Sequence, residues 1–183
     1  MIRISRAILV LLIAIVSGSA CSTGQSLAQA IAYASLQEVM DGIVDPSADE
    51  LWGAVETTVT STGVEEKQPH TSEEWADVRR KAITLLEAST LLAIEGRQVA
   101  VKPFPAEAAG ALDSQQIQAR IAANRPAFVG FAGALRSAAR QSLAAIDAKD
   151  PAALVKAGGV LDEVCEGCHR TFWYPDQVIP PLP

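Results

Sequence analysis

The first pattern along the chain after residue 30 is a stripe of apolar residues with the helical period. Its members are Leu36, Val39, Met40, Ile43, Val44, Leu51, Val55 and Val59. Asp45 and Pro46 interrupt the stripe, and this pair suits the cap and the first position of a renewed helix. We therefore predict one helix from about Ala32 to Thr60, kinked or briefly broken at Pro46, and then a polar loop to Thr71.

Three further segments repeat the helical period, and each begins at a recognisable cap. The caps are a capping box at Thr71–Glu74, Asp113, and the pair Asp150–Pro151. Pro126 should bend or split the middle segment after Asn124, because proline removes a helical donor. Four amphipathic segments bury their stripes most simply against one another, so the predicted fold class is all-α, a four-helix bundle.

Composition and charge agree with a helical domain and exclude some partners. Hydrophobic residues make up 49% of the 183 residues but aromatics only 5%, and the apolar content is rich in Ala and Leu, which favour helices. The net charge of −6 argues against nucleic acid or anionic lipid surfaces as partners. We predict one domain over residues 32–175, with a Pro-rich tail over 176–183.

The amino terminus has the features of an export signal. Arg3 and Arg6 precede an unbroken apolar run over residues 7–16, and small residues follow over 17–20. The run is shorter than the ~20 apolar residues that span a bilayer. We therefore predict a cleaved signal peptide over residues 1–20 and an exported protein that faces the periplasm.

The residues at the end of the signal allow two alternatives for the mature amino terminus, one lipidated and one not. Residues 18–21, Gly-Ser-Ala-Cys, resemble a bacterial lipobox, although the usual Leu three places before the Cys is replaced by Gly18. Cys21 would then be lipidated and anchor the protein to a membrane. In the alternative, cleavage follows Ala20 or the triplet over 28–30, and Cys21 is discarded or left as a free thiol. We predict that residues 21–31 form a flexible tether.

The motif that carries chemistry is Cys165-Glu166-Gly167-Cys168-His169. Two thiols at this spacing can each add to a vinyl group of haem, and the adjacent His can bind the iron as its proximal ligand. A thioredoxin-like CxxC belongs where a strand meets the start of a helix, and a zinc site needs four ligands where only His70 is left over. Both alternatives are weaker than covalent haem. Export supports haem, because bacterial haem attachment takes place outside the cytoplasmic membrane.

A CxxCH motif near the carboxyl end of a helical bundle resembles the cytochrome c-prime class. The resemblance covers about residues 32–174, and its specific motif is Cys165 to His169. It implies one covalent haem c held by Cys165, Cys168 and His169. Family members often continue His-x-x-aromatic-Arg; here Phe172 matches the aromatic, but Trp173 replaces the Arg. Arg170 is a substitute candidate for neutralising the haem propionates.

The sixth iron ligand is predicted to be Met40, which lies where low-spin relatives carry an axial Met. A thioether suits ferrous iron and raises the reduction potential. The alternatives are an open iron site and, more weakly, His70, and a Met on an apolar stripe is usually core. Some aromatic residues are candidates for contact with the porphyrin, or else plain core: Trp52, Trp75, Trp173, Phe128 and Phe131.

These features together predict a periplasmic c-type cytochrome that carries electrons between redox proteins. No acid, base or nucleophile constellation accompanies the motif, so we do not expect an enzyme. One rival is a high-spin protein that binds nitric oxide or carbon monoxide at an open iron. Another is a lipidated subunit of a larger membrane redox complex. Members of the class are often dimers, so a homodimer is an expected assembly.

Overall fold

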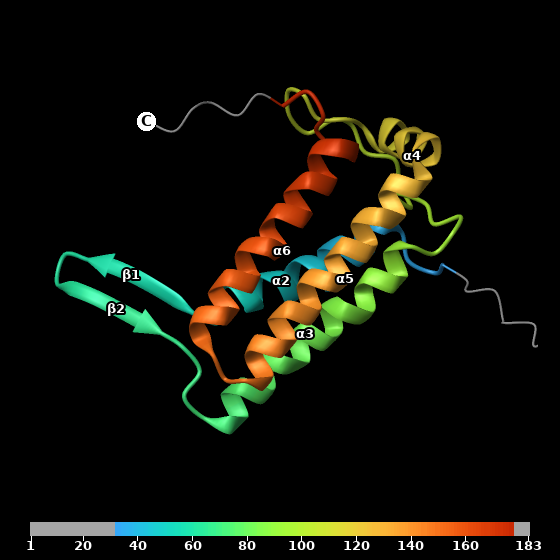
Figure 1. Ribbon diagram of the computed structural model, residues 1–183. Helices are drawn as coiled ribbons and strands as arrows, with labels where there is room; N and C mark the ends of the chain where they lie inside the picture. The colour runs from blue at the N-terminus through green and yellow to red at the C-terminus, as the bar shows by residue number, and fades with distance from the viewer. Residues whose placement is uncertain (1–31, 178–183) are drawn as a thin grey trace, which may run out of the picture.

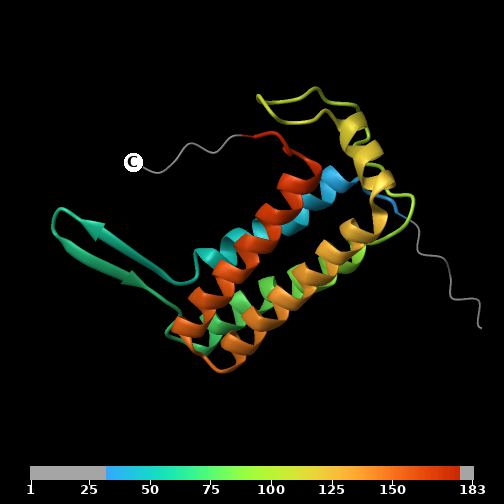
Figure 2. The ribbon, with the colours of Figure 1, turned by 45° about the horizontal axis from the view of Figure 1, so that its top comes forward.

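The structure is a computed structural model that describes residues 32–177. It is mostly helical, with one small two-stranded sheet (Figures 1 and 2). In chain order the elements are α1 (Leu36–Val39), the π-helix η1 (Met40–Val44), α2 (Asp45–Trp52), β1 (Glu56–Thr60), β2 (Gly63–Lys67), α3 (Ser72–Leu92), α4 (Ser114–Ala123), α5 (Arg125–Asp147) and α6 (Pro151–Phe172). The predicted signal peptide, the tether with Cys21 and the last six residues of the tail lie outside the described range.

The elements α1, η1 and α2 form one continuous helical run from Leu36 to Trp52. Ser35 caps it in a capping box with Glu38. The predicted kink or break at Pro46 is replaced by a turn of π-helix, in which the Asp45 N–H donates to the carbonyl of Met40. The wider turn lets the chain pass Pro46, which has no N–H of its own and would crowd a carbonyl in a regular helix.

The prediction that this helix continues to Thr60, with a polar loop behind it, is wrong. The helix ends at Trp52, and residues 56–67 form an antiparallel hairpin in which Val59 pairs with Val64. Consecutive β-branched residues before Gly63 explain the strand, because they fit a pleated ribbon better than a helix. Gly63, with φ of 149°, turns the chain where other residues would be strained. The hairpin projects away from the helices (Figures 1 and 2).

The long helices lie side by side around one core. α5 packs between α3 and α6, and α2 packs against both α3 and α6 (Figure 1). The largest fully buried side chains include Leu85 from α3, Ile146 from α5, and Leu154 and Leu161 from α6. The helical stripes predicted from the sequence therefore meet one another, which buries them from water.

The predicted helix starts of α3, α4 and α6 are confirmed. Thr71 accepts from the backbone of Glu74 within a capping box, and Asp113 and Asp150 accept from the first turns of α4 and α6. The predicted split before Pro126 is also confirmed, because α4 ends at Ala123 and α5 begins at Arg125. α4 consequently leaves the line of α5 and turns across one end of the helices (Figure 2).

The connection between α3 and α4 closes the same end of the molecule. Leu36 and Gln37 donate backbone hydrogen bonds to the carbonyls of Gln98 and Val99, which ties the first helical run to this loop. A second apolar cluster forms here from Val99, Ile117, Ile121, Phe128 and Phe172. Over residues 32–177, no helix combines the length and apolar character needed to cross a membrane.

Candidate functional site

The CxxCH motif occupies the last turns of α6. The helix continues unbroken through it to Phe172, so Cys165 and Cys168 are neighbours one turn apart. Both are free thiols and partly buried, and His169 follows directly in the helix. The helix therefore holds two sulfur atoms and one imidazole close together near its carboxyl end.

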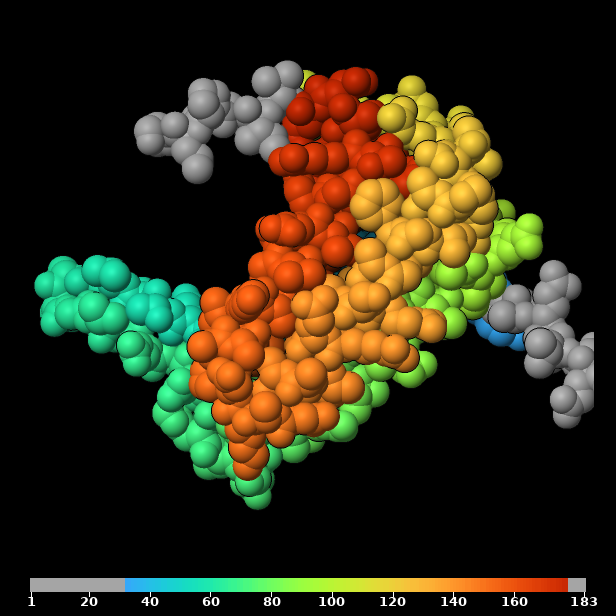
Figure 3. Space-filling view, in the orientation of Figure 1, coloured from blue at the N-terminus to red at the C-terminus, as the bar shows by residue number. Residues whose placement is uncertain are grey.

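A cavity of about 160 Å³ lies against this end of α6. Cys168 and His169 line it from α6, and Met40 lines it from η1. Its apolar wall includes Leu36, Val99, Ile117, Ile121, Phe128 and Phe172. Figure 3 shows the surface hollowed between the carboxyl-terminal half of α6 and the beginning of α5.

A second cavity, of about 30 Å³, shares part of the same lining. Met40, Asp45, Phe128, Cys168 and His169 line both cavities. Cys165 lines the smaller one, together with Phe131, Ala132, Leu135 and Val164. The two hollows are therefore adjacent parts of one apolar site, which contains both thiols, the imidazole and the thioether.

The placement of Met40 depends on the π-helical turn. Met40 begins η1, and its carbonyl accepts the five-residue hydrogen bond from Asp45. Short π-helical turns alter the direction of side chains and occur frequently at functional sites. The structure thus brings Met40 and His169, which are far apart in the sequence, to the lining of one cavity.

His169 lies among aromatic rings. The Trp173 ring meets it edge to face at 5.2 Å between centroids, and Tyr174 lies at 6.0 Å. Burial lowers the pKa of His169, although the nearby carboxylates of Asp45 and Glu166 oppose this effect. A lowered pKa favours the neutral imidazole, which is the form that binds a metal.

The two thiols are held in their protonated form. Burial raises the pKa of Cys165 to about 11 and that of Cys168 to about 12, and the neighbouring Asp45 and Asp162 contribute at Cys165. A redox-active dithiol needs a lowered thiol pKa, because the thiolate is the nucleophile. The raised thiol pKa values are opposite in direction to the lowered values of a thioredoxin-like centre. Within residues 32–177, no group of three or more His, Cys, Asp or Glu gathers as a metal-binding cluster.

Asp45 lies at the site, although its place in the sequence predicts only a helix cap. Its side chain makes no capping hydrogen bond to the start of α2, since the helical run continues through it. It lines both cavities beside His169. Burial raises the pKa of Asp45, and attraction to His169 partly offsets the rise. Asp45 follows Met40 by five residues. This spacing indicates that both side chains reach one cavity only when the π-helical turn is known.

The buried indole N–H of Trp173 has no hydrogen-bond partner among the described residues. Trp173 lines the larger cavity beside Cys168 and His169. An unsatisfied buried donor costs about 1–3 kcal/mol, so this N–H favours a ligand that brings an acceptor into the site. Haem carries two carboxylate groups and an apolar ring. The donor, the apolar wall and the CxxCH residues suit such a group, whereas the carboxylates of Asp41, Asp45 and Glu107 in the same lining would repel its carboxylates.

The structure sorts the other aromatic candidates into two groups. Phe128 lines both cavities and Phe131 the smaller one, and both rings meet Phe172 edge to face. Trp75 is instead buried in the main core, and Trp52 donates its N–H to the carbonyl of Gly158 outside both cavities. Among these five candidates, Phe128, Phe131 and Trp173 therefore line the cavities, and Trp52 and Trp75 do not.

Arg170, the candidate partner for haem propionates, forms an ion pair beside the motif. Its guanidinium donates to Glu166 at 2.7 Å, and Arg170 lines neither cavity. Glu166 also accepts from the Tyr174 hydroxyl at 2.5 Å. These two hydrogen bonds to Glu166 hold Tyr174 against the last turns of α6, and Arg170 contributes one of them.

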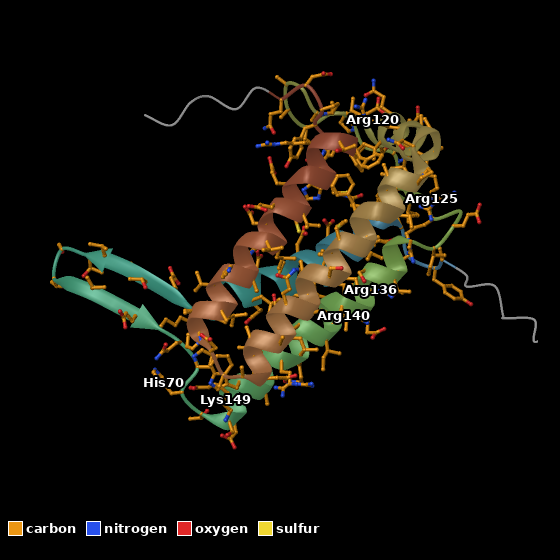
Figure 4. All side chains as sticks on the ribbon, in the orientation of Figure 1. His70, Arg120, Arg125, Arg136, Arg140 and Lys149 are labelled. Atoms are coloured by element: carbon orange, nitrogen blue, oxygen red, sulfur yellow. The ribbon has the colours of Figure 1, made fainter. Side chains whose placement is uncertain are left out.

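His70 lies at the opposite end of the helices. It precedes α3, whose first residue Ser72 accepts a hydrogen bond from Lys149 just before α6 begins (Figure 4). From Pro151 to His169, α6 extends for about 27 Å at the usual helical rise. His70 is therefore remote from the cavities and cannot share a ligand with His169 in this fold.

Comparison with known protein families, with curated protein sequences and with solved structures found no match for this chain.

Proposed function

We propose that this chain is a c-type cytochrome with one covalent haem, which carries electrons in the periplasm. One observation supports this most directly. The Cys and His residues of the CxxCH motif line an apolar site together with Met40, which comes from a different helical segment. A bound haem supplies an iron that changes between the ferric and ferrous states by one electron.

Different residues of the chain would bind different parts of the haem. Cys165 and Cys168 would form thioether bonds to its vinyl groups, and His169 would bind the iron on the proximal side. Met40 would bind it on the distal side. The phenylalanines around the cavities would exclude water, which limits the solvent reorganisation that accompanies a change of iron charge. The Trp173 N–H would donate to the haem carboxylates in place of the Arg that the c-prime class carries.

The helical arrangement supports the finer proposal of a c-prime-like four-helix bundle. The run from Leu36 to Trp52, α3, α5 and α6 would be its four helices, with the motif near the carboxyl end of the last. The hairpin and α4 would be additions to that plan. Export by the predicted signal, with Cys21 as a candidate lipid anchor, would place this domain where haem attachment occurs.

The experiment that tests the proposal is an absorption spectrum of the exported full-length chain, oxidised and reduced, with acid-solvent extraction of the pigment. We expect a haem c spectrum whose pigment stays with the polypeptide and adds the mass of one haem. A colourless protein, produced in a host that matures c-type cytochromes and recovered with intact thiols, would contradict the proposal.

A Met40→Leu substitution should convert the iron from six-coordinate low-spin to five-coordinate high-spin. The thioether ligand is lost while the side-chain volume is nearly kept. We expect loss of the weak Met-to-iron charge-transfer band, rapid carbon monoxide binding to the ferrous form, and a fall in reduction potential on the order of 0.1 V. Optical spectroscopy and redox titration measure these changes.

Ile43→Leu is the matched control, because Ile43 lies in the same π-helical turn and lines neither cavity. It should keep the wild-type spectrum. If wild-type protein already binds carbon monoxide rapidly and Met40→Leu changes nothing, Met40 is not a ligand. The gas-binding function would then replace electron transfer.

A further inference from the structure

Charge is strongly segregated along this chain. Between Ser114 and Ile146 the sequence contains four arginines and no Asp or Glu. All 21 acidic residues lie elsewhere, in a chain whose net charge is −6. The four residues are Arg120, Arg125, Arg136 and Arg140, and we call them the arginine face. A concentrated positive surface on an otherwise acidic protein gives the molecule a marked charge asymmetry.

None of these arginines is neutralised by a carboxylate within residues 32–177. The ion pairs there join Arg79 to Asp147, Arg80 to Asp77 and Arg170 to Glu166. The arginine face therefore keeps its positive charge at the surface of the described chain.

Neutral groups nevertheless hold three of the arginines in place. Arg120 donates to the carbonyl of Thr171 at 2.5 Å, and Arg125 donates to the carbonyl of Ala93 at 2.5 Å. Arg136 donates to the hydroxyls of Ser89 and Thr90. Carbonyl and hydroxyl partners orient a guanidinium without cancelling its charge. Such pre-ordered arginines lose less conformational entropy on binding, and Arg is enriched in protein interfaces.

The arginine face adjoins the proposed haem site. Arg125 lies over the ring of Phe128 at 5.6 Å, and Phe128 lines both cavities. Arg120 is bonded to Thr171, next to Phe172 in the cavity wall. Arg136 and Arg140 continue along α5 on nearly the same side as Arg125, because their spacings are close to whole helical turns (Figure 4).

One exposed apolar side chain lies among these charges. Val129 falls on the same side of α5, between Arg125 and Arg136, and is 41% exposed. An apolar side chain bordered by charged groups suits a protein interface, in which a polar rim encloses an apolar centre.

We propose that the arginine face docks an acidic protein that exchanges one electron with the haem. This inference rests on the proposed cytochrome function. One electron leaves the reduced partner, which becomes oxidised, and converts ferric haem to ferrous; the reverse exchange reduces an oxidised partner. The acidic remainder of the surface repels such a partner, so the charge asymmetry steers it to the arginine face and to the nearby cavity.

The test compares two double variants of the full-length holoprotein with equal changes in net charge. Arg136→Glu with Arg140→Glu reverses two charges of the arginine face, and neither residue lines the cavities. Arg80→Glu with Lys156→Glu makes the same change on α3 and α6. The probe is a reduced plant-type ferredoxin, chosen for its acidic surface and low potential. Stopped-flow absorbance then follows reduction of the ferric haem at low and high salt.

We expect the arginine-face variant to react about tenfold more slowly than wild type at low salt, within the range known for electrostatic steering, and the difference to shrink at high salt. The control variant should slow by a clearly smaller factor. Arg136→Gln with Arg140→Gln should give an intermediate loss, which provides a second reading if charge reversal disturbs folding.

Equal slowing of both double variants would overturn the docking surface, because net charge alone would explain it. Salt-sensitive binding of wild type to phosphatidylglycerol vesicles, lost only in the arginine-face variant and without a difference in ferredoxin rates, would assign the face to a membrane and overturn the protein partner. Wild-type protein without covalent haem would overturn the cytochrome function itself. Normal haem with unchanged rates would overturn docking alone.

Discussion

Replacing both Cys165 and Cys168 with Ser is expected to abolish covalent haem in the exported protein. Serine keeps the approximate size of each side chain but cannot form the thioether bond. With both bonds gone, only His169 and Met40 would bind the group, and extraction would release it. Haem staining of a denaturing gel, together with the intact mass of the chain, measures the loss.

Three further variants make this result specific. Cys21→Ser should keep full haem staining, since Cys21 begins the predicted tether and does not belong to the CxxCH motif. Each single substitution in the motif should retain one thioether and a shifted spectrum. Covalent haem surviving in the double variant, or lost with Cys21→Ser, would show that the motif does not attach the haem as proposed.

The largest expected effect on stability comes from Leu85→Ala. Leu85 has no exposed surface and lies in the main core. Removing its branched side chain leaves a cavity in a packed interior, which typically costs about 3 kcal/mol of unfolding free energy. Guanidinium unfolding of wild-type and variant protein, in the same haem state and followed by far-ultraviolet circular dichroism, measures the change.

Ile83→Ala is its control on the same helix. Ile83 is 36% exposed and is only two positions away, so the same kind of truncation should cost less than about 1 kcal/mol. Equal losses at the two positions would mean that α3 does not bury the face described above. The helix would then pack in a different rotation.

Local chemistry explains why the helix starts could be predicted. Thr71, Asp113 and Asp150 each accept from a backbone N–H two or three residues further on, so the information lies within a few positions. Pro126 acts just as locally. The hairpin was missed because Val55 and Val59 also fit a helical stripe. Choosing between helix and strand there requires knowing that no helical neighbour covers residues 56–67, which are mostly exposed.

Some residues of the candidate site can likewise be predicted from local sequence, and others depend on the packing of distant segments. The sequence alone identifies Cys165, Cys168 and His169, because their chemistry depends on neighbours within a single helical turn. It also marks Met40, through the resemblance to the c-prime class. Three features depend on how distant segments pack: the cavity lining that Met40 shares with His169, the place of Asp45 in that lining, and the buried N–H of Trp173.

Tertiary structure also decided where the arginines lie. The sequence shows four arginines in an acid-free stretch, but only the fold places Arg120 and Arg125 beside the cavity and Arg170 away from it. Hydrogen bonds within a helix turn are set by nearby residues. The positions of two helices relative to each other are set by the burial of whole apolar faces, to which every segment of the core contributes at once.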